Sequence, residues 1–409
     1  MTTPKIVAAY RITPTLLLAG ASFVFAKGPT FQGLGTVPGA VQSFAFAISQ
    51  DGTTVVGDSD LGAFRWTAAT GMQALGVLPG GHTSTAWGVS GDGSVVVGEA
   101  DTAGMGRRGF RWTQLTGMMS LGVPSGSIQS WATGISADTT VVCGYVEVNP
   151  TSSYRWTAAG GFTLLGVLPG GSNSTYCSAS ADGSVIVGSS ASGSGQRAYR
   201  WTATTGMLDL GVPPGFNWSS ARGVSADGSV VVGALSNGPG IAAAFRWTQA
   251  GGFEVIEATT AANGVSADGQ VVIGTTANGG FIWTPARGVV LLQDLLQGVI
   301  PPGWNNLRAW GVSADGLRIT GWGYNPQGIP PQGIAEAWLA TLTPEMLGCY
   351  ANCDRSTSPP TLNVNDFVCF QQKYAASDPD ANCDDSTSAP VLNINDFICF
   401  QQKFAAGCT

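Results

Sequence analysis

Residues 90–113 begin S-G-D-G-S-V-V-V-G, continue through a variable polar stretch and end in G-F-R-W-T. Related copies of this stretch run from Ser49 to Trp338. Each copy has a Ser-x-Asp turn and then an aromatic-rich Arg-Trp-Thr or a degenerate form of it. The turn aspartates are Asp51, Asp92, Asp138, Asp182, Asp227, Asp268 and Asp315, and the tryptophans that follow them are Trp66, Trp112, Trp156, Trp201, Trp247, Trp283 and Trp338. One unit of this size cannot bury its own apolar face, so the sequence predicts a repeat fold in which neighbouring units bury it.

The spacing of the copies indicates the kind of unit. The turn aspartates recur every 41 to 47 residues, and a four-stranded propeller blade takes roughly 40 to 50 residues. In the second copy we expect strands over 85–89, 94–98, 109–113 and 119–122. Asp92-Gly93 separates the first two, and Asp-Gly between apolar runs favours a hairpin because glycine accepts the positive φ of a tight turn. We therefore predict an all-β, seven-bladed β-propeller over residues 27–347.

A short motif predicts how the ring closes. An apolar residue followed by Leu-Gly marks the fourth strand of the first four copies, as at Leu75-Gly76. A further copy, Phe31 to Gly35, stands ahead of the first repeat, whereas the seventh repeat lacks a clear one. We expect this N-terminal strand to complete the last blade, which leaves no unpaired sheet edge at the seam.

Composition narrows the class of protein. Charged residues make up 11% of the chain, against about 25% in average soluble domains. Glycine, at 59 of 409 residues, suits short strands and tight turns. The net charge of −7 argues against a nucleic-acid-binding protein, which normally carries a basic patch.

The first 26 residues differ from the rest. Lys5 and Arg11 precede an apolar run, Ile12 to Phe25, that ends in the small-x-small pattern Val24-Phe25-Ala26. This pattern is typical of a cleavable signal peptide. The alternative is a transmembrane anchor, but the run is shorter than the roughly 20 residues that a spanning helix needs. We expect residues 1–26 to be a signal peptide and the mature chain to be extracellular or on the cell surface, without a membrane span.

The repeats resemble the HAF-type repeats of bacterial exported proteins. Gly88-Val89-Ser90 and the Leu-Pro-Gly-Gly links at 78–81 and 168–171 carry the match, which extends over about 300 residues. The resemblance implies a propeller-like fold and, since the family has no agreed activity, implies none here.

The residues present in every copy are best explained by packing. We expect the Arg-Trp-Thr tryptophans to fill the wedges between blades, because a residue found in all copies usually solves a packing problem that all copies share. The turn aspartates should bond their own backbone. The arginines before the tryptophans should be blade-edge hydrogen-bond or salt-bridge partners; they are Arg65, Arg111, Arg155, Arg200 and Arg246.

Loop residues that differ between copies are better functional candidates, since function tends to lie on variable loops of a rigid scaffold. Two roles stay open for the aromatic ones: stacking on sugar rings or, for several of them, a place in the core. They are Trp87, Trp131, Trp218, Trp304, Trp310, Trp322 and Tyr324. The single histidine, His82, lies in a Gly-rich link without a nucleophile motif and favours a solvated loop. The acids Glu99, Asp101, Glu147, Glu254 and Glu257 show no spacing that singles out a glycosidase pair. Cys143 and Cys177 are either buried thiols or an inter-blade bridge.

Two function classes follow for the propeller. The first is a non-catalytic binding or surface protein, with an extracellular polysaccharide as one candidate ligand. The alternative is a polysaccharide-degrading hydrolase or lyase. Two or three acids in the central funnel would favour the enzyme, whereas an apolar or Asn/Ser-lined funnel would favour the binder.

Residues 348–409 form a separate module with a 30-residue internal repeat that starts at Ala351. Oxygen-bearing side chains at alternate positions, followed by an apolar stripe at helical spacing, are typical of a calcium loop and helix. Phe367, Phe370 and Tyr374 form one such stripe, and we expect it to pack on its counterpart, Phe397, Phe400 and Phe404.

This tail resembles the cysteine-containing dockerin modules of planctomycete-like bacteria, which bind cohesin-like receptors. The resemblance implies two calcium sites, with the ligands Asn352, Asp354, Ser356, Asn363 and Asp366 in the first loop and Asn382, Asp384, Ser386, Asn393 and Asp396 in the second. It implies receptor contacts at Val364, Asn365, Gln372 and Lys373 and, in the second repeat, Ile394, Asn395, Gln402 and Lys403. Asn in place of the leading Asp, Ser in place of the third acid, a three-residue insertion and a missing loop glycine predict weak calcium binding. A register that starts at Asp354 and Asp384 stays open.

Six cysteines gather in this module, and an even number in a small exported unit indicates a disulfide framework. We hypothesise bridges within each repeat, Cys353 to Cys369 and Cys383 to Cys399, and a clasp from Cys349 to Cys408. A calcium-free stalk held by these bridges is the alternative interpretation of the tail.

Overall fold

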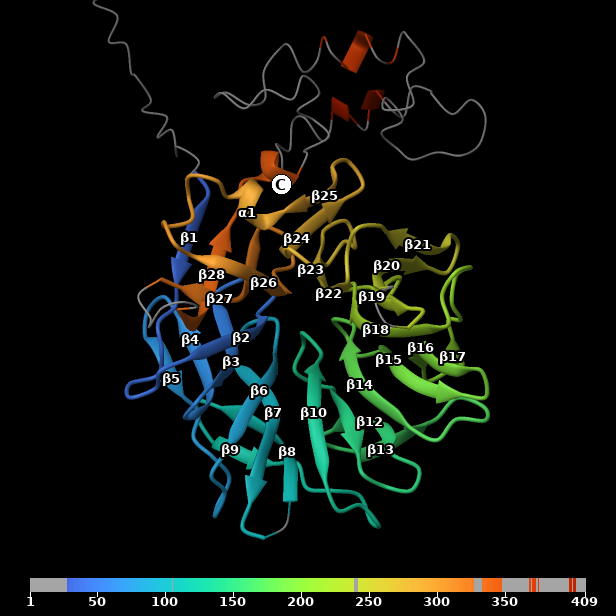
Figure 1. The fold of residues 1–409 in the computed structure, drawn as a ribbon. Helices are drawn as coiled ribbons and strands as arrows, with labels where there is room; N and C mark the ends of the chain where they lie inside the picture. The colour runs from blue at the N-terminus through green and yellow to red at the C-terminus, as the bar shows by residue number, and fades with distance from the viewer. Residues whose placement is uncertain are drawn as a thin grey trace, which may run out of the picture.

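The computed structural model describes residues 28–104, 106–238, 242–326 and 333–347, and in the tail residues 368, 370–372, 374, 397–398 and 400–401. Seven four-stranded sheets lie around a common centre (Figure 1), and every strand pair within them is antiparallel. The prediction of a seven-bladed propeller is confirmed. In six blades the strands follow chain order from the centre outward.

The first four blades have the following strands. They are β2 Ser43–Ile48, β3 Thr54–Ser59, β4 Gly62–Thr67 and β5 Gly71–Ala74; β6 Ser84–Val89, β7 Val95–Thr102, β8 Gly106–Thr113 and β9 Gly117–Ser120; β10 Ser130–Ile135, β11 Val142–Val146, β12 Ser152–Thr157 and β13 Gly161–Gly166; and β14 Ser174–Ala179, β15 Val185–Ser192, β16 Gly195–Thr202 and β17 Gly206–Asp209.

The last three blades are β18 Trp218–Val224, β19 Val230–Ser236, β20 Ala242–Thr248 and β21 Gly252–Ile256; β22 Ala261–Val265, β23 Val272–Thr276, β24 Gly279–Thr284 and β25 Gly288–Leu291; and β26 Asn305–Val312, β27 Arg318–Asn325, β28 Ile334–Thr341 and β1 Thr30–Gly33. A short helix, α1 Leu292–Leu295, follows β25, and a 3-10 turn, η1 Pro344–Leu347, follows β28.

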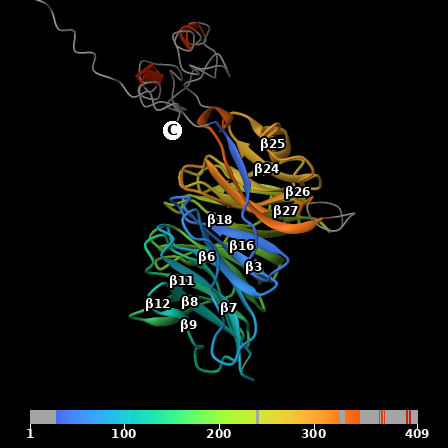
Figure 2. The ribbon, with the colours of Figure 1, turned by 90° about the vertical axis from the view of Figure 1, so that its left-hand side faces the viewer.

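The N-terminal strand closes the ring as predicted. β1 pairs antiparallel with β28, with Thr30 opposite Thr341 and Gly33 opposite Trp338. Figures 1 and 2 show the blue β1 alongside the orange strands of the last blade. One blade therefore joins the two ends of the propeller sequence, and the seam has no open sheet edge.

Backbone hydrogen bonds join every blade to the next at the Ser-x-Asp turns. The amide of Gly91 donates to the carbonyl of Ala137 at 3.0 Å, and the amide of Ala314 in the last blade donates to Gln50 of the first at 2.9 Å. Seven such bonds, one at each joint, form a closed ring; the others join Asp51 to Gly91, Asp138 to Ala181, Ala181 to Ala226, Ala226 to Ala267 and Ala267 to Ala314.

A second network uses the serine that opens an inner strand. Ser84 Oγ donates to the carbonyl of Gly76 at 2.7 Å and accepts the amide of Ala63, in the preceding blade, at 3.0 Å. Ser43, Ser130, Ser174 and Ser219 make the same pair of bonds. A hydroxyl that both donates and accepts thus ties the start of one inner strand to the third strand of the preceding blade and to the link between the two blades.

The recurrent side chains are structural. Asp92 accepts hydrogen bonds from Ser90 Oγ and from the amide of Ser94, and the other turn aspartates do the same. Arg65, Arg200 and Arg246 donate through Nε to the turn-glycine carbonyl of the next blade at 3.0 to 3.2 Å. The predicted blade-edge role is confirmed for these three arginines.

Trp338 departs from the predicted pattern. It lies opposite Gly321, whereas in the first blade the partner of the corresponding Gly57 is Phe64. Trp338 therefore occupies the phenylalanine position, and Ala340 stands where the other blades have tryptophan. The seventh copy diverges at this strand, so counting tryptophans assigned Trp338 to the wrong position.

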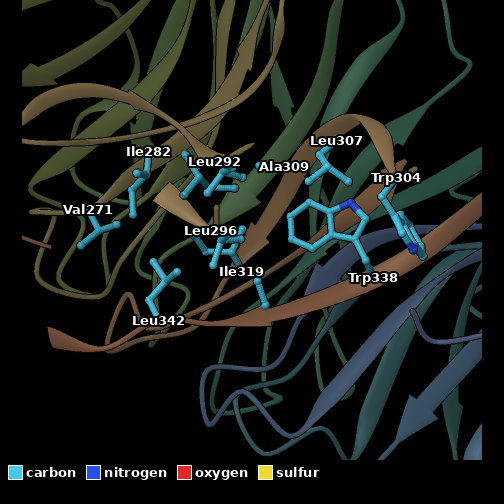
Figure 3. Close-up of a cluster of buried hydrophobic side chains, with 12 residues drawn as sticks. Val271, Ile282, Leu292, Leu296, Trp304, Leu307, Ala309, Ile319, Trp338 and Leu342 are labelled. Carbon is cyan, nitrogen blue, oxygen red and sulfur yellow. The ribbon is translucent and has the colours of Figure 1, made fainter. Parts of the chain in front are cut away.

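The larger side chain at this position is accommodated by a separate apolar cluster. Trp338 is fully buried among Leu292 and Leu296 of the α1 segment, Trp304 just before β26 and Leu307 within β26 (Figure 3). Phe31 of β1 packs on Trp338 and Trp304, with ring centroids 5.6 and 5.1 Å apart. The long link between the last two blades thus helps to hold the closing strand.

No helix among the described residues is long and apolar enough to span a bilayer.

Two stretches of the tail are described, and both are helical. The rings of Phe370 and Phe400 stack with their centroids 4.1 Å apart, and both side chains are buried. The predicted contact between the two apolar stripes is present at these residues.

We expect Phe31→Ala to lower the free energy of unfolding by about 2 to 4 kcal/mol, because it leaves a cavity between the closing strand and the two tryptophans. Urea unfolding followed by tryptophan fluorescence would measure this. Leu115→Ala is the matched control, since Leu115 is 94% exposed and should change stability by less than about 0.5 kcal/mol. Equal stability of the two variants would show that the closing strand is not held by this contact.

Candidate functional site

Every inner strand carries a β-bulge, at the same position of the repeat in six blades and one residue earlier in the fourth, and the bulge residue has no partner in the ladder. A bulge redirects its side chain and is frequent beside functional sites. The seven bulge residues line one central cavity of about 630 Å³, within the roughly 300 to 1,000 Å³ range of ligand sites. They are Phe46, Trp87, Thr133, Tyr176, Arg222, Asn263 and Trp310.

The cavity combines repeated and variable residues. Toward the Ser-x-Asp turns it is lined by aliphatic side chains from the repeated Gly-Val-Ser segment; these are Ile48, Val89, Ile135, Val224, Val265 and Val312. The bulge residues, in contrast, differ in nearly every blade. The repeated residues therefore build the cavity, and the variable ones determine its chemistry.

Three neighbouring blades supply an aromatic wall. Phe46 stacks on Trp87 with ring centroids 4.7 Å apart and meets Trp310 edge-on at 5.7 Å. Trp218, at the start of β18 on the fifth blade, also lines the cavity but is not part of this wall. Aromatic faces of this kind offer flat apolar surface to a ligand.

The polar wall lies on blades four to six. Arg222 donates through a terminal guanidinium nitrogen to Asn263 Oδ1 at 2.7 Å, and Asn263 Nδ2 donates to the carbonyl of Ala309 at 2.9 Å. Arg222 is exposed to the cavity, yet the surrounding walls of protein desolvate its guanidinium enough to lower its pKa.

Tyr176 is strained in this wall. Its φ of 49° lies in the left-handed region, which costs a non-glycine residue about 1 to 2 kcal/mol. The bulge in this blade comes one residue earlier in the repeat than in the other six, so Tyr176 enters the cavity and Cys177 is buried. Strained residues of this kind gather at functional sites.

A group of ionisable residues lies at the strand ends farther from the turns. Burial raises the pKa of Asp58 to about 6, against hydrogen bonds from the Ser59 amide and Thr85. Burial also raises the pKa of Glu99, although Arg107 opposes the shift through an ion pair with 2.7 Å between N and Oε1. Burial raises the pKa of Tyr145 on the next blade as well. Asp58 and Glu99 come from adjacent blades and repel each other electrostatically.

The predicted aromatic residues fall into three groups. Trp87, Trp218 and Trp310 line the cavity. Trp131 stacks on Tyr145 at 4.6 Å, and Trp322 lies between Phe44 at 5.3 Å and Tyr324 at 6.1 Å. Trp304 is buried in the cluster around Trp338, so for this residue the core role is the correct alternative.

The predicted acids do not form one site. Asp101 accepts the amides of His82 and Thr83 and so fixes the link that contains the exposed histidine. Glu147 accepts from Gln129, and Glu254 lies 3.5 Å from Arg246. In the described part of the chain no three His, Cys, Asp or Glu side chains gather as a metal site would require.

The two repeat cysteines are free thiols. Both are buried, and Cys177 Sγ donates to the carbonyl of Gly144 at 2.9 Å. The structure thus has buried thiols at these positions and no inter-blade bridge.

The sequence offered a signal for the residues that it did not single out. Phe46, Thr133, Arg222 and Asn263 all stand directly before the repeated small residue of the inner strand, at a position whose residue type differs in nearly every copy. Asp58 stands at a second such position, one residue after the glycine of the second strand.

The predicted signal peptide lies outside the described residues. So do the ten calcium ligands, the six tail cysteines and the predicted receptor contacts, except for Gln372, which is helical and exposed. These assignments stay predictions.

No protein family matches the chain, and no curated protein matches its sequence, so the resemblances to HAF-type repeats and to dockerins also stay predictions. Among solved structures, oligogalacturonate lyase from Vibrio parahaemolyticus is similar at 9% identity, over 78% of this chain and 98% of the lyase, with a TM-score of 0.50. TolB from Acinetobacter baumannii is similar at 13% identity, over 60% of this chain and 61% of TolB, with a TM-score of 0.41. At 9% identity the likeness to the lyase shows the propeller fold alone.

We expect Asp58→Asn to make the protein more stable than the wild type above pH 6. Between the unfolded pKa of 3.8 and the folded value of about 6, the folded state binds more protons, so wild-type stability falls as the pH rises through that window. The gain at pH 7 should be about 1 to 2 kcal/mol after allowance for solvent screening, and should vanish below about pH 4.

Urea unfolding over this pH range would measure the difference. Asp60→Asn is the control, and we expect it to lower the free energy of unfolding at neutral pH. The amides of Gln42 and Val41 lower the pKa of the exposed Asp60, so its carboxylate stabilises the folded state. A gain from Asp58→Asn that does not depend on pH would contradict the assignment.

Proposed function

We propose that the propeller is a carbohydrate-binding protein whose ligand enters the central cavity, and that it is not an enzyme. The observation that carries this proposal is the placement of the seven bulge residues, three of them contiguous aromatic rings, around one cavity of ligand size. Sugar rings present an apolar face of C–H groups and a rim of hydroxyls. The aromatic wall suits the face, and Thr133, Ser220 and Asn263 suit the rim.

The cavity favours binding over cleavage. Among the described residues that line it there is no Asp, Glu or His, and glycoside hydrolysis usually needs two carboxyl groups facing the bond to be broken. Glu99 is ion-paired with Arg107 and is only 7% exposed, which suits a structural role.

One observation keeps a polysaccharide-degrading enzyme as the second candidate. Asp58, with a pKa of about 6, and Glu99 come from adjacent blades, and a carboxyl group with a raised pKa can act as a general acid. A screen of polysaccharides for reducing ends or unsaturated products would decide between the candidates. Cleavage that Asp58→Asn abolishes would favour the enzyme, and binding without cleavage would favour the binder.

We further propose that the chain is exported and that its tail attaches it, with calcium, to a cohesin-like receptor on a scaffold or cell surface. The support is the repeated Asn-x-Asp-x-Ser loop, which precedes an apolar stripe in both repeats. The stacked Phe370 and Phe400 agree with a tail of two packed helices.

We expect Trp87→Ala to weaken the binding of a saccharide that the full chain selects on a glycan array by about tenfold, since loss of one stacking platform costs on the order of 1 to 2 kcal/mol. Isothermal calorimetry would measure the dissociation constants. Leu115→Ala should bind like the wild type. Unchanged binding by Trp87→Ala would place the sugar elsewhere.

We expect calorimetry on the full chain to show two weak calcium-binding events, since each loop has few carboxylates. The double variant Asp366→Ala/Asp396→Ala should lose both, whereas Asp378→Ala, between the repeats, should keep them. No heat with the wild type would count against calcium and favour the disulfide-held stalk.

A further inference from the structure

The cavity has two unlike sides. In a ring of seven, the fifth blade lies across the centre from the first and second. Arg222 of the fifth blade therefore faces the stacked Phe46 and Trp87 across the cavity. A ligand between them meets flat aromatic surface on one side and a guanidinium on the other.

The charge of Arg222 is not neutralised within the described part of the chain. The two ion pairs found there join Arg107 to Glu99 and Arg246 to Glu254, and the described residues that line the cavity include no Asp or Glu. A guanidinium has five N–H donors, and Arg222 uses one of them, toward Asn263. The other four have no partner among the described residues.

Arg222 is nevertheless held in place. Asn263 accepts its N–H and is itself anchored to the carbonyl of Ala309, so a chain of two hydrogen bonds runs over three blades. Tyr176 stands on the other side, on a strained bulge. A fixed guanidinium fork with unused donors matches the two oxygens of a carboxylate or the oxygens of a sulfate ester.

We infer that the ligand of the cavity is an acidic saccharide, whose sugar ring lies on the Phe46–Trp87 side and whose anionic group pairs with Arg222. This inference rests on the proposed carbohydrate-binding function and names its ligand class. The anionic group is the shared chemistry, and it is either the carboxylate of a uronic acid or a sulfate ester.

The test is calorimetry on the full chain with three probes of equal length and linkage: a hexuronic acid oligomer, its carboxyl-reduced neutral counterpart and a sulfated form of that neutral oligomer. We expect at least one acidic probe to bind about tenfold more tightly than the neutral one, as a charge-assisted bidentate pair predicts. The acidic probe that binds better identifies the anionic group.

Arg222→Gln should reduce this preference to less than about threefold, because the charge-assisted pair is lost. Arg222→Lys should keep part of the preference. It gives a second measurement in case the glutamine variant does not fold. Arg108→Gln is the matched control. It removes one positive charge from a side chain of the second blade that bonds backbone carbonyls. Its preference for the acidic probe should equal that of the wild type.

The outcomes separate the inference from the proposed function. Equal binding of neutral and acidic probes, or a preference that survives in Arg222→Gln, overturns the inference and leaves carbohydrate binding in place. Failure of the wild type to bind any saccharide, on the array or among the probes, overturns both.

Discussion

Seven backbone hydrogen bonds run from blade to blade at the Ser-x-Asp turns, and the bond from Ala314 to Gln50 returns the series to its start. A closed series of this kind cannot lose one joint without strain on its neighbours. It depends on the turn geometry that Asp and Gly enforce, because the turn directs the amide and the carbonyl between Ser and Asp at the two adjacent blades. The recurrence of Ser-x-Asp-Gly thus follows from ring closure and needs no ligand.

Because the repeated residues close the ring of blades, the residues at the other positions of the repeat can differ from blade to blade. Each inner strand uses a bulge to turn one side chain toward the centre, and the seven bulge residues are Phe, Trp, Thr, Tyr, Arg, Asn and Trp. Phe46, Trp87 and Trp310 fall on three adjacent blades, and Arg222 lies across the ring from Phe46 and Trp87. A sevenfold scaffold therefore supports a site without sevenfold symmetry, and this asymmetry is what allows the cavity to orient a ligand.

The sequence was sufficient for the architecture because blade length, turn and closing strand each leave a local pattern. It was not sufficient for register where a copy diverges: Trp338 looks like an Arg-Trp-Thr tryptophan, but pairing across the sheet puts it in the phenylalanine position. Nor does local pattern reveal a bulge, which arises from pairing between strands, so Arg222 and Tyr176 were not singled out. Trp304 looked like a loop residue because its burial depends on Phe31, more than 270 positions away.

The central claim is that the variable bulge residues form one oriented site for an acidic sugar. A crystal structure of the full chain soaked with a hexuronic acid oligomer would test it most directly. The account predicts one sugar ring in the central cavity against Phe46 and Trp87, with its carboxylate within hydrogen-bonding distance of Arg222. An oligomer bound only outside the cavity, or bound within it with the carboxylate turned away from Arg222, would contradict the account.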